Sequence, residues 1–167
     1  SNKSVSELYE PGSVFKLITA SIALEENITD TDVAGDFNCT GSENVNGTPI
    51  RCWSDHPHNS QTLRQALQNS CNPAFIQLGR KIGAKTLYKY YRAFGLFNRT
   101  NPYFYGESNS VFFPENNINE FNVATMSFGQ RFTITPIQLI TAVSSIANEG
   151  VLMQPRIVKE IKNTDTN

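Results

Sequence analysis

The chain has 167 residues, a hydrophobic fraction of 39%, a charged fraction of 17% and a net charge of -1. This length suffices for one soluble globular domain with its own core, and the near-neutral charge excludes the basic surface typical of nucleic-acid binding. No apolar run approaches the roughly 18 residues of a membrane span, and no signal peptide is recognisable. The chain begins without methionine, so we expect it to be an excised piece of a longer protein.

The first predicted helix covers residues 13–27. It begins directly after Pro11-Gly12, a pair that breaks regular structure, and its apolar residues recur at helical spacing. Ser13 is a favoured N-cap residue, so we expect its side chain to cap this helix. Residues 1–12 are expected to approach the helix as an extended loop.

The middle of the chain divides into an irregular segment and a group of helices. Residues 28–61 are rich in Asp, Asn, Gly, Thr and Pro and are predicted to be irregular, with a β-hairpin turn at Asn46-Gly47. Residues 62–95 are predicted to form helices that are interrupted near Ser70. The expected helix starts and ends are marked by Thr62, Pro73, Gly83 and Gly95.

The last third of the chain is predicted to contain a loop, a helix and a strand. Residues 96–134 form one long aromatic and Asn-rich loop, a length that is uncommon in compact domains unless the loop serves a site. A cap and a terminal glycine predict a helix over residues 135–150. Val and Ile around Pro155 predict an edge strand over residues 151–162. The expected fold class is therefore mostly α with minor β.

The sequence YEPGSVFK places Ser13 and Lys16 three residues apart at a helix start, where residues i and i+3 share one face. A serine hydroxyl needs an adjacent base to act as a nucleophile, and a lysine can serve when burial lowers its pKa. Backbone N–H groups at the helix start can contribute to an oxyanion site. The alternative is an ordinary cap followed by a surface lysine. Gly12, which allows close backbone approach before the serine, favours catalysis.

A second candidate pair, Ser70 and Asn72, lies between two predicted helices in the sequence NSCNPAF. The Ser70 hydroxyl can relay a proton between Lys16 and a leaving group, and the Asn72 amide can hydrogen-bond a substrate amide. The alternative is a simple helix break, since Ser and Asn are natural at such junctions, and Ser42 begins another Ser-x-Asn. Ser70 is preferred because the flanking helices would fix its position.

Three cysteines and one histidine form a candidate metal site. Three thiolates and an imidazole are a recognised structural zinc set, although the spacings of 13, 6 and 13 residues do not match short zinc knuckles. A metal can also order a segment with few apolar residues, such as residues 28–61. The candidate ligands are Cys39, Cys52, His58 and Cys71, and the spare candidates are Asp55 and His56.

The odd number of cysteines leaves other arrangements open. A Cys39–Cys52 disulfide across the predicted hairpin is the main alternative to zinc, and free thiols are the other. If zinc binds, Cys71 matters most, because it lies between Ser70 and Asn72 and would fix the loop that carries both. Zinc would then be a structural ion and not the Lewis acid of a reaction.

Three stretches in chain order resemble landmarks of the transpeptidase domain of class B penicillin-binding proteins of Gram-positive type. They are YEPGSVFKLITA, TLRQALQNSCNPAF and SFGQRFTITPIQL. These proteins are serine enzymes that cross-link peptidoglycan and are acylated by β-lactams; the family includes sporulation-specific members, and some members bind zinc near the second stretch. The resemblance spans nearly the whole chain and is weaker over residues 96–121.

The resemblance implies roles for four residues. Ser13 would be the acylated nucleophile and Lys16 its general base, with Ser70 and Asn72 as the second motif. The implied fold is the helical part of the penicillin-binding-protein and serine β-lactamase-like fold, so that the chain would be a partial, truncated transpeptidase domain. The family's third motif, Lys-Ser/Thr-Gly, does not occur in this chain, and we expect it to lie beyond Asn167.

The expected function is peptidoglycan cross-linking by acyl transfer on D-Ala-D-Ala stem peptides, with β-lactam binding. Without the third motif, this piece alone is expected to be inactive or impaired. The alternatives are a β-lactam-sensing receptor domain of related fold, a serine β-lactamase and a metal-stabilised interaction module. The resemblance also implies a membrane-anchored parent protein on the extracytoplasmic face of the bacterial membrane, within a cell-wall synthesis complex and without nucleic acid as a partner.

Overall fold

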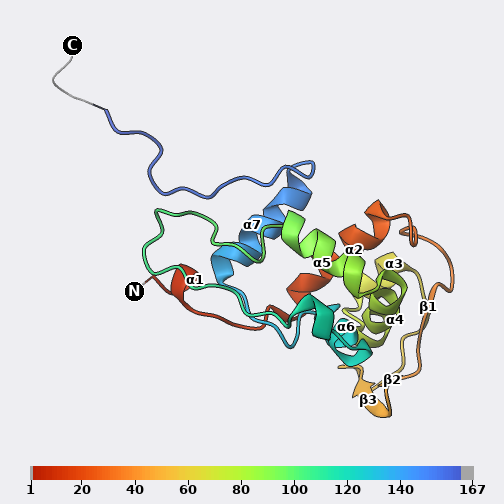
Figure 1. The fold of residues 1–167 in the computed structure, drawn as a ribbon. Helices are drawn as coiled ribbons and strands as arrows, with labels where there is room; N and C mark the ends of the chain where they lie inside the picture. Colours follow the sequence, from red (N-terminus) through yellow and green to blue (C-terminus); the bar gives the residue numbers. More distant parts are fainter. Residues whose placement is uncertain (1, 163–167) are drawn as a thin grey trace.

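The computed structural model describes residues 2–162 and is mainly helical with a little β-structure, as the sequence predicts (Figure 1). Within these residues no helix is both long and apolar enough to cross a lipid bilayer. The α-helices are α1 (Lys3–Ser6), α2 (Lys16–Glu25), α3 (Leu63–Gln68), α4 (Asn72–Ile82), α5 (Ala84–Ala93), α6 (Glu120–Met126) and α7 (Pro136–Ala147). The 3₁₀ turns are η1 (Gly12–Phe15) and η2 (Glu115–Asn117), and the strands are β1 (Phe37–Cys39), β2 (Ser42–Val45), β3 (Thr48–Arg51) and β4 (Asn59–Gln61).

Two small antiparallel sheets order the segment that was expected to be irregular. Strand β1 pairs with β4, which places Cys39 opposite Asn59, and β2 pairs with β3. Asn46 and Gly47 both have positive φ angles, 50° and 84°, as a type I′ hairpin turn requires. The structure thus confirms the predicted hairpin turn and corrects the prediction that residues 28–61 lack regular structure.

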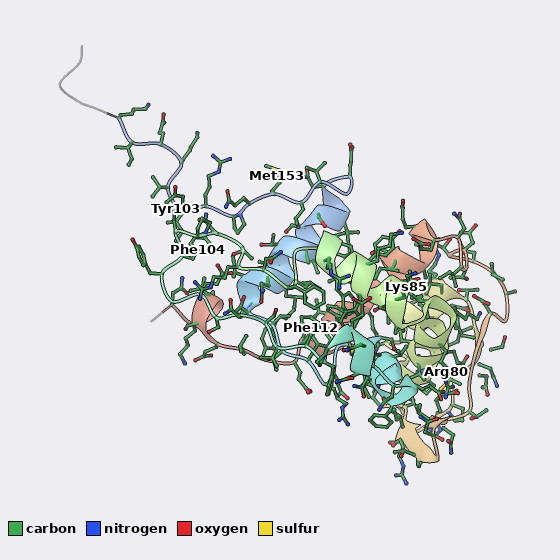
Figure 2. All side chains as sticks on the ribbon, viewed as in Figure 1. Arg80, Lys85, Tyr103, Phe104, Phe112 and Met153 are labelled. Atoms are coloured by element: carbon green, nitrogen blue, oxygen red, sulfur yellow. The ribbon has the colours of Figure 1, made fainter. Side chains whose placement is uncertain are left out.

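Arg80 of α4 ties the β2–β3 hairpin to the helices (Figure 2). Its guanidinium pairs with Glu43 of β2 and, at 2.8 Å, with Glu120 of α6. It also donates to the carbonyl oxygen of Asn44 at 2.6 Å. Together with the buried side chain of Val45, this charged contact holds the hairpin against α4.

Helices α3 and α7 begin as the sequence predicts. The Thr62 hydroxyl accepts from the N–H of Gln65 at 3.2 Å, and the Gln65 side chain accepts from the N–H of Thr62 at 2.9 Å. Thr135 and Gln138 repeat this arrangement at the start of α7. Both are capping boxes, which satisfy N–H groups that have no partner inside the helix.

The structure corrects three further predictions. Helix α6 lies inside the segment 96–134 that was predicted to be one long loop; it is capped by Asn119, whose side chain accepts from the N–H of Asn122 at 2.9 Å. Helix α1 lies in the stretch predicted to be extended. Residues 151–162 form no strand, because no described strand lies beside them, and they leave α7 as an extended segment (Figure 1).

Phe15 anchors the candidate nucleophile segment in the core. Its side chain is fully buried, with its ring centroid 5.2 Å from that of Tyr91 and 4.7 Å from that of Phe132. Phe112 stacks on Phe132, and Figure 2 shows Phe112 among the helices and Tyr103 of the same long segment at the periphery. Helix α2 contacts α4, α5 and α7, so the core fixes the backbone that carries Ser13.

Candidate active site

Ser13 does not cap a helix, contrary to the prediction from the sequence. It lies within η1, which continues into α2, and neither element has a side-chain cap. The Ser13 Oγ atom instead lies 3.0 Å from Lys16 Nζ. The hydroxyl is therefore not engaged in capping and faces the candidate base.

Lys16 is completely buried and lies at the centre of the site. Its Nζ atom lies 3.0 Å from Ser13 Oγ and 3.0 Å from Ser70 Oγ. It also lies 2.8 Å from the carbonyl oxygen of Ser70 and 2.7 Å from Asn72 Oδ1. The structure thus brings together all four residues that the two sequence motifs indicated, although more than fifty residues separate the motifs.

The surroundings of Lys16 shift its titration towards the neutral form. Burial lowers the pKa of Lys16 to about 8, although the thiols of Cys71 and Cys52 act in the opposite direction. A neutral amine has two N–H groups and one lone pair. The Ser70 carbonyl and Asn72 Oδ1 can only accept hydrogen bonds and use both N–H groups, which leaves the lone pair for a hydroxyl. A neutral Lys16 in this geometry is able to accept a proton from the Ser13 or the Ser70 hydroxyl, both at 3.0 Å.

Ser70 occupies a backbone position that favours glycine. Its φ is +48°, its N–H donates to the Leu67 carbonyl at 3.0 Å, and the N–H of Cys71 donates to the Ala66 carbonyl at 2.9 Å. These two bonds form a Schellman motif at the end of α3, with Ser70 in the left-handed position where glycine is usual. A serine there costs about 1 kcal/mol. We attribute its presence to the hydroxyl group that contacts Lys16.

The turn formed by residues 127–130 (SFGQ) packs against Gly12, the residue before Ser13. The N–H of Gly12 donates to the carbonyl oxygen of Gly129 at 2.8 Å, and the Thr19 hydroxyl donates to that of Ser127 at 2.8 Å. A Cβ atom on Gly129, whose φ is +83°, would lie 2.1 Å from the Gly12 oxygen. Only glycine fits at position 129 in this contact. The presence of a glycine there is the single feature of the sequence that could have indicated the contact.

Cys39, Cys52, His58 and Cys71 meet beside Ser70. Their ligand atoms all lie within 4.8 Å of one another, and Cys52 Sγ is 3.5 Å from His58 Nδ1. The three cysteines are buried free thiols, and no disulfide joins them in residues 2–162. In a tetrahedral zinc site the sulfur atoms lie about 3.8 Å apart, so small side-chain movements would produce that geometry. The residues present fit a zinc ion.

Two groups of residues near the site remain: the spare metal ligands, and residues that belong to no sequence motif. Asp55 and His56 are not part of the cluster. Trp53 and Gln61 carry no motif signal, yet both contact Asn69, the residue before Ser70, at 2.8 and 2.9 Å. Their role depends on contacts between segments that no local pattern encodes.

A serine hydroxyl next to a buried lysine, on a mainly helical body, is the site that this fold presents. Residues 1–167 match the family described as penicillin binding protein transpeptidase domain. The chain therefore belongs to this family.

Curated relatives match nearly all of this chain but are much longer. Stage V sporulation protein D of Bacillus subtilis is 40% identical over 159 residues, which cover 95% of this chain and 24% of that protein. Peptidoglycan D,D-transpeptidase PbpA of Mycobacterium tuberculosis is 36% identical over 174 residues, with 98% of this chain and 34% of that protein covered. The chain thus spans about a quarter of the first relative and about a third of the second.

Solved structures share the fold. A peptidoglycan synthetase from Bifidobacterium adolescentis superposes with a TM-score of 0.90 at 30% identity, covering 100% of this chain and 30% of that one. Penicillin binding protein 3 from Mycobacterium tuberculosis, complexed with aztreonam, has a TM-score of 0.86 at 29% identity, covering 95% of this chain and 35% of that one. Both comparisons place the mainly helical chain within the penicillin-binding-protein transpeptidase fold.

Proposed function

We propose that the protein carrying this chain cross-links peptidoglycan by serine acyl transfer on D-Ala-D-Ala stem peptides and is acylated by β-lactams. The observation that carries the proposal is the buried Lys16 amine within 3.0 Å of Ser13 Oγ, Ser70 Oγ and Asn72 Oδ1. The relative named as a D,D-transpeptidase and the structural neighbour complexed with aztreonam support it.

The first half-reaction acylates Ser13. Lys16 accepts the hydroxyl proton while Ser13 Oγ attacks the carbonyl carbon between the two D-alanines. The C–N bond breaks as Ser70 passes a proton from Lys16 to the leaving nitrogen, and free D-alanine departs. Asn72 donates its amide N–H groups to the peptide while its Oδ1 holds Lys16. The product is an ester between Ser13 Oγ and the shortened stem peptide.

The second half-reaction transfers the acyl group. An amine of a neighbouring stem peptide attacks the ester carbonyl and forms the new amide bond. Its proton passes through Ser70 and Lys16 to Ser13 Oγ as the C–O bond breaks, which restores the hydroxyl and the neutral lysine. Atoms and protons balance without any metal or redox group.

This proposal predicts a defined product from synthetic substrates. The full-length protein is incubated with a stem peptide ending in D-Ala-D-Ala and with an amine-bearing acceptor peptide, and the products are separated by mass spectrometry. We expect D-alanine release together with a cross-linked dimer, and neither with Ser13→Ala. Hydrolysis of the donor without any transfer product would instead identify a carboxypeptidase or hydrolase.

The substrate indicates where the protein acts. Peptidoglycan stem peptides lie outside the bacterial cytoplasmic membrane, so we place the protein on that face, anchored to the membrane and working with other cell-wall synthesis proteins. The 40% identity to Stage V sporulation protein D supports a role in sporulation.

We also propose that Cys39, Cys52, His58 and Cys71 hold a structural zinc ion. The ligand atoms of these four residues lie within 4.8 Å of one another, and the three thiols are buried, a donor set that suits zinc. Bound zinc would join the β1–β4 region to the start of α4 and would hold the residue between Ser70 and Asn72. Zinc would supply structural order, whereas the chemistry remains with Ser13 and Lys16.

Removal of the metal is expected to lower stability before it lowers acylation. The full-length protein should contain one zinc per chain, and EDTA should lower its Tm by several degrees, with a slower β-lactam acylation as the second effect. Cys52→Ser should lose the zinc, whereas the matched control Asp55→Asn, outside the cluster, should keep it. An unchanged Tm with EDTA and no zinc by metal analysis would disprove this site.

A further inference from the structure

We infer that Trp53 is a positioning residue for Ser70 and acts through the carbonyl group of Asn69. The inference rests on the proposed acyl transfer at Ser13. The indole Nε1–H of Trp53 donates to the Asn69 carbonyl oxygen at 2.8 Å. Asn69 directly precedes Ser70, so this bond acts on the peptide unit that joins the two residues.

The Asn69 carbonyl controls the orientation of Ser70. Asn69 is the C-cap of α3, where carbonyl groups have no partner inside the helix. The plane of the 69–70 peptide unit is defined by this carbonyl, and rotation of that plane changes the φ of Ser70. A φ of +48° is unfavourable for serine and persists only when surrounding contacts impose it. The indole N–H supplies one such contact.

A second contact from the same segment acts on the side chain of Asn69. Asn69 Nδ2 donates to Gln61 Oε1 at 2.9 Å, and Gln61 is only 2% exposed. The other end of this amide, Gln61 Nε2, is buried without an oxygen or nitrogen partner in the described part of the chain and faces the Cys71 thiol. Segment 52–61 therefore holds Asn69 through both its carbonyl group and its side chain, while Lys16 contacts Ser70 itself.

Packing does not account for a tryptophan at this position. The Trp53 residue is 67% exposed, and its nearest aromatic neighbour is His58, with the ring centroids 6.1 Å apart. Burial of the indole therefore contributes little to stability, whereas its N–H group donates a hydrogen bond of normal length to the Asn69 carbonyl oxygen. An exposed indole could instead serve as a platform for the substrate, and the experiment below separates the two roles.

The test compares Trp53→Phe with Trp53→Leu in the zinc-loaded, full-length protein. Phe keeps an aromatic ring and loses the N–H, whereas Leu loses both. Stopped-flow acylation with a chromogenic cephalosporin gives the dissociation constant of the first complex and the acylation rate constant separately. We expect both variants to lower the rate constant by about five- to tenfold and to leave the dissociation constant within about twofold of wild type.

Tyr90→Phe is the matched control, because it removes a hydrogen bond that a half-buried aromatic residue donates to Glu26. We expect it to leave acylation unchanged. If Trp53→Phe acylates at the wild-type rate, or if it changes only the dissociation constant, the positioning role is refuted, and the latter result would indicate a substrate platform. If the wild-type protein is not acylated at all, the proposed function fails instead.

Discussion

Lys16→Met is expected to lower the rate of acylation by a β-lactam about 10³-fold. Methionine is similar in length and fits a buried position, but it has no lone pair to accept the Ser13 proton. The variant also leaves the Ser70 carbonyl and Asn72 Oδ1 without their shared donor. Circular dichroism and zinc content would verify that the variant is folded. Acylation within tenfold of wild type would exclude Lys16 as the base.

Because only the neutral Lys16 amine can accept the Ser13 proton, the acylation rate should depend on pH. The pKa of Lys16 is about 8 in the folded protein, below its ordinary value of 10.5, so the base form becomes dominant as pH rises through about 8. We expect the acylation rate to rise from pH 6 and to level off above about pH 8. Between about pH 8 and 10.5 the unfolded chain binds more protons at Lys16 than the folded chain does. The free energy of unfolding of the wild-type protein should therefore increase, relative to that of Lys16→Met, as the pH rises through that interval.

Ser70→Gly is expected to separate stability from activity. Both Ser70→Gly and Ser70→Ala remove the hydroxyl that contacts Lys16, so both should lower acylation by about 10²-fold. Only glycine relieves the left-handed backbone, and it should make the protein about 1 kcal/mol more stable than Ser70→Ala. A glycine variant is normally less stable than the alanine variant at the same position, so the reversed order would show that the backbone at residue 70 is left-handed.

Urea unfolding of both variants, with the acylation rate measured in parallel, checks this expectation. Equal stability, or the usual order with alanine more stable, would mean that the backbone of Ser70 is not strained. Retained acylation in Ser70→Gly would mean that the Ser70 hydroxyl does not relay the proton. Either result would remove the reason given for serine at a glycine position.

The sequence predicts the parts of the site that depend on short spacing. Ser13 and Lys16 are three residues apart on adjacent turns, and Ser70 and Asn72 flank a helix boundary, so local rules suffice to place each pair. The capping residues Thr62 and Thr135 are predicted for the same reason: a cap depends on the next three residues. The hairpin at Asn46 follows from turn chemistry alone.

Other features depend on contacts that no local rule contains. Helix α6 has only seven residues and follows an Asn-rich stretch, so its apolar residues are too few to distinguish it from a loop. An edge strand over residues 151–162 would need a neighbouring strand, which the described residues do not provide. Trp53 acquires its contact with Asn69 only when the chain folds back, and the close approach of Gly129 to Gly12 arises in the same way.

Mass spectrometry of the full-length protein after reaction with a fluorescent penicillin tests the central claim most directly. The intact mass should increase by one penicillin, peptide mapping should place the adduct on Ser13, and the adduct should persist for minutes. Ser13→Ala should show no adduct. A wild-type protein that forms no adduct, or forms it on another residue, would contradict Ser13 as the nucleophile, and an adduct that clears within seconds would contradict a transpeptidase in favour of a β-lactamase.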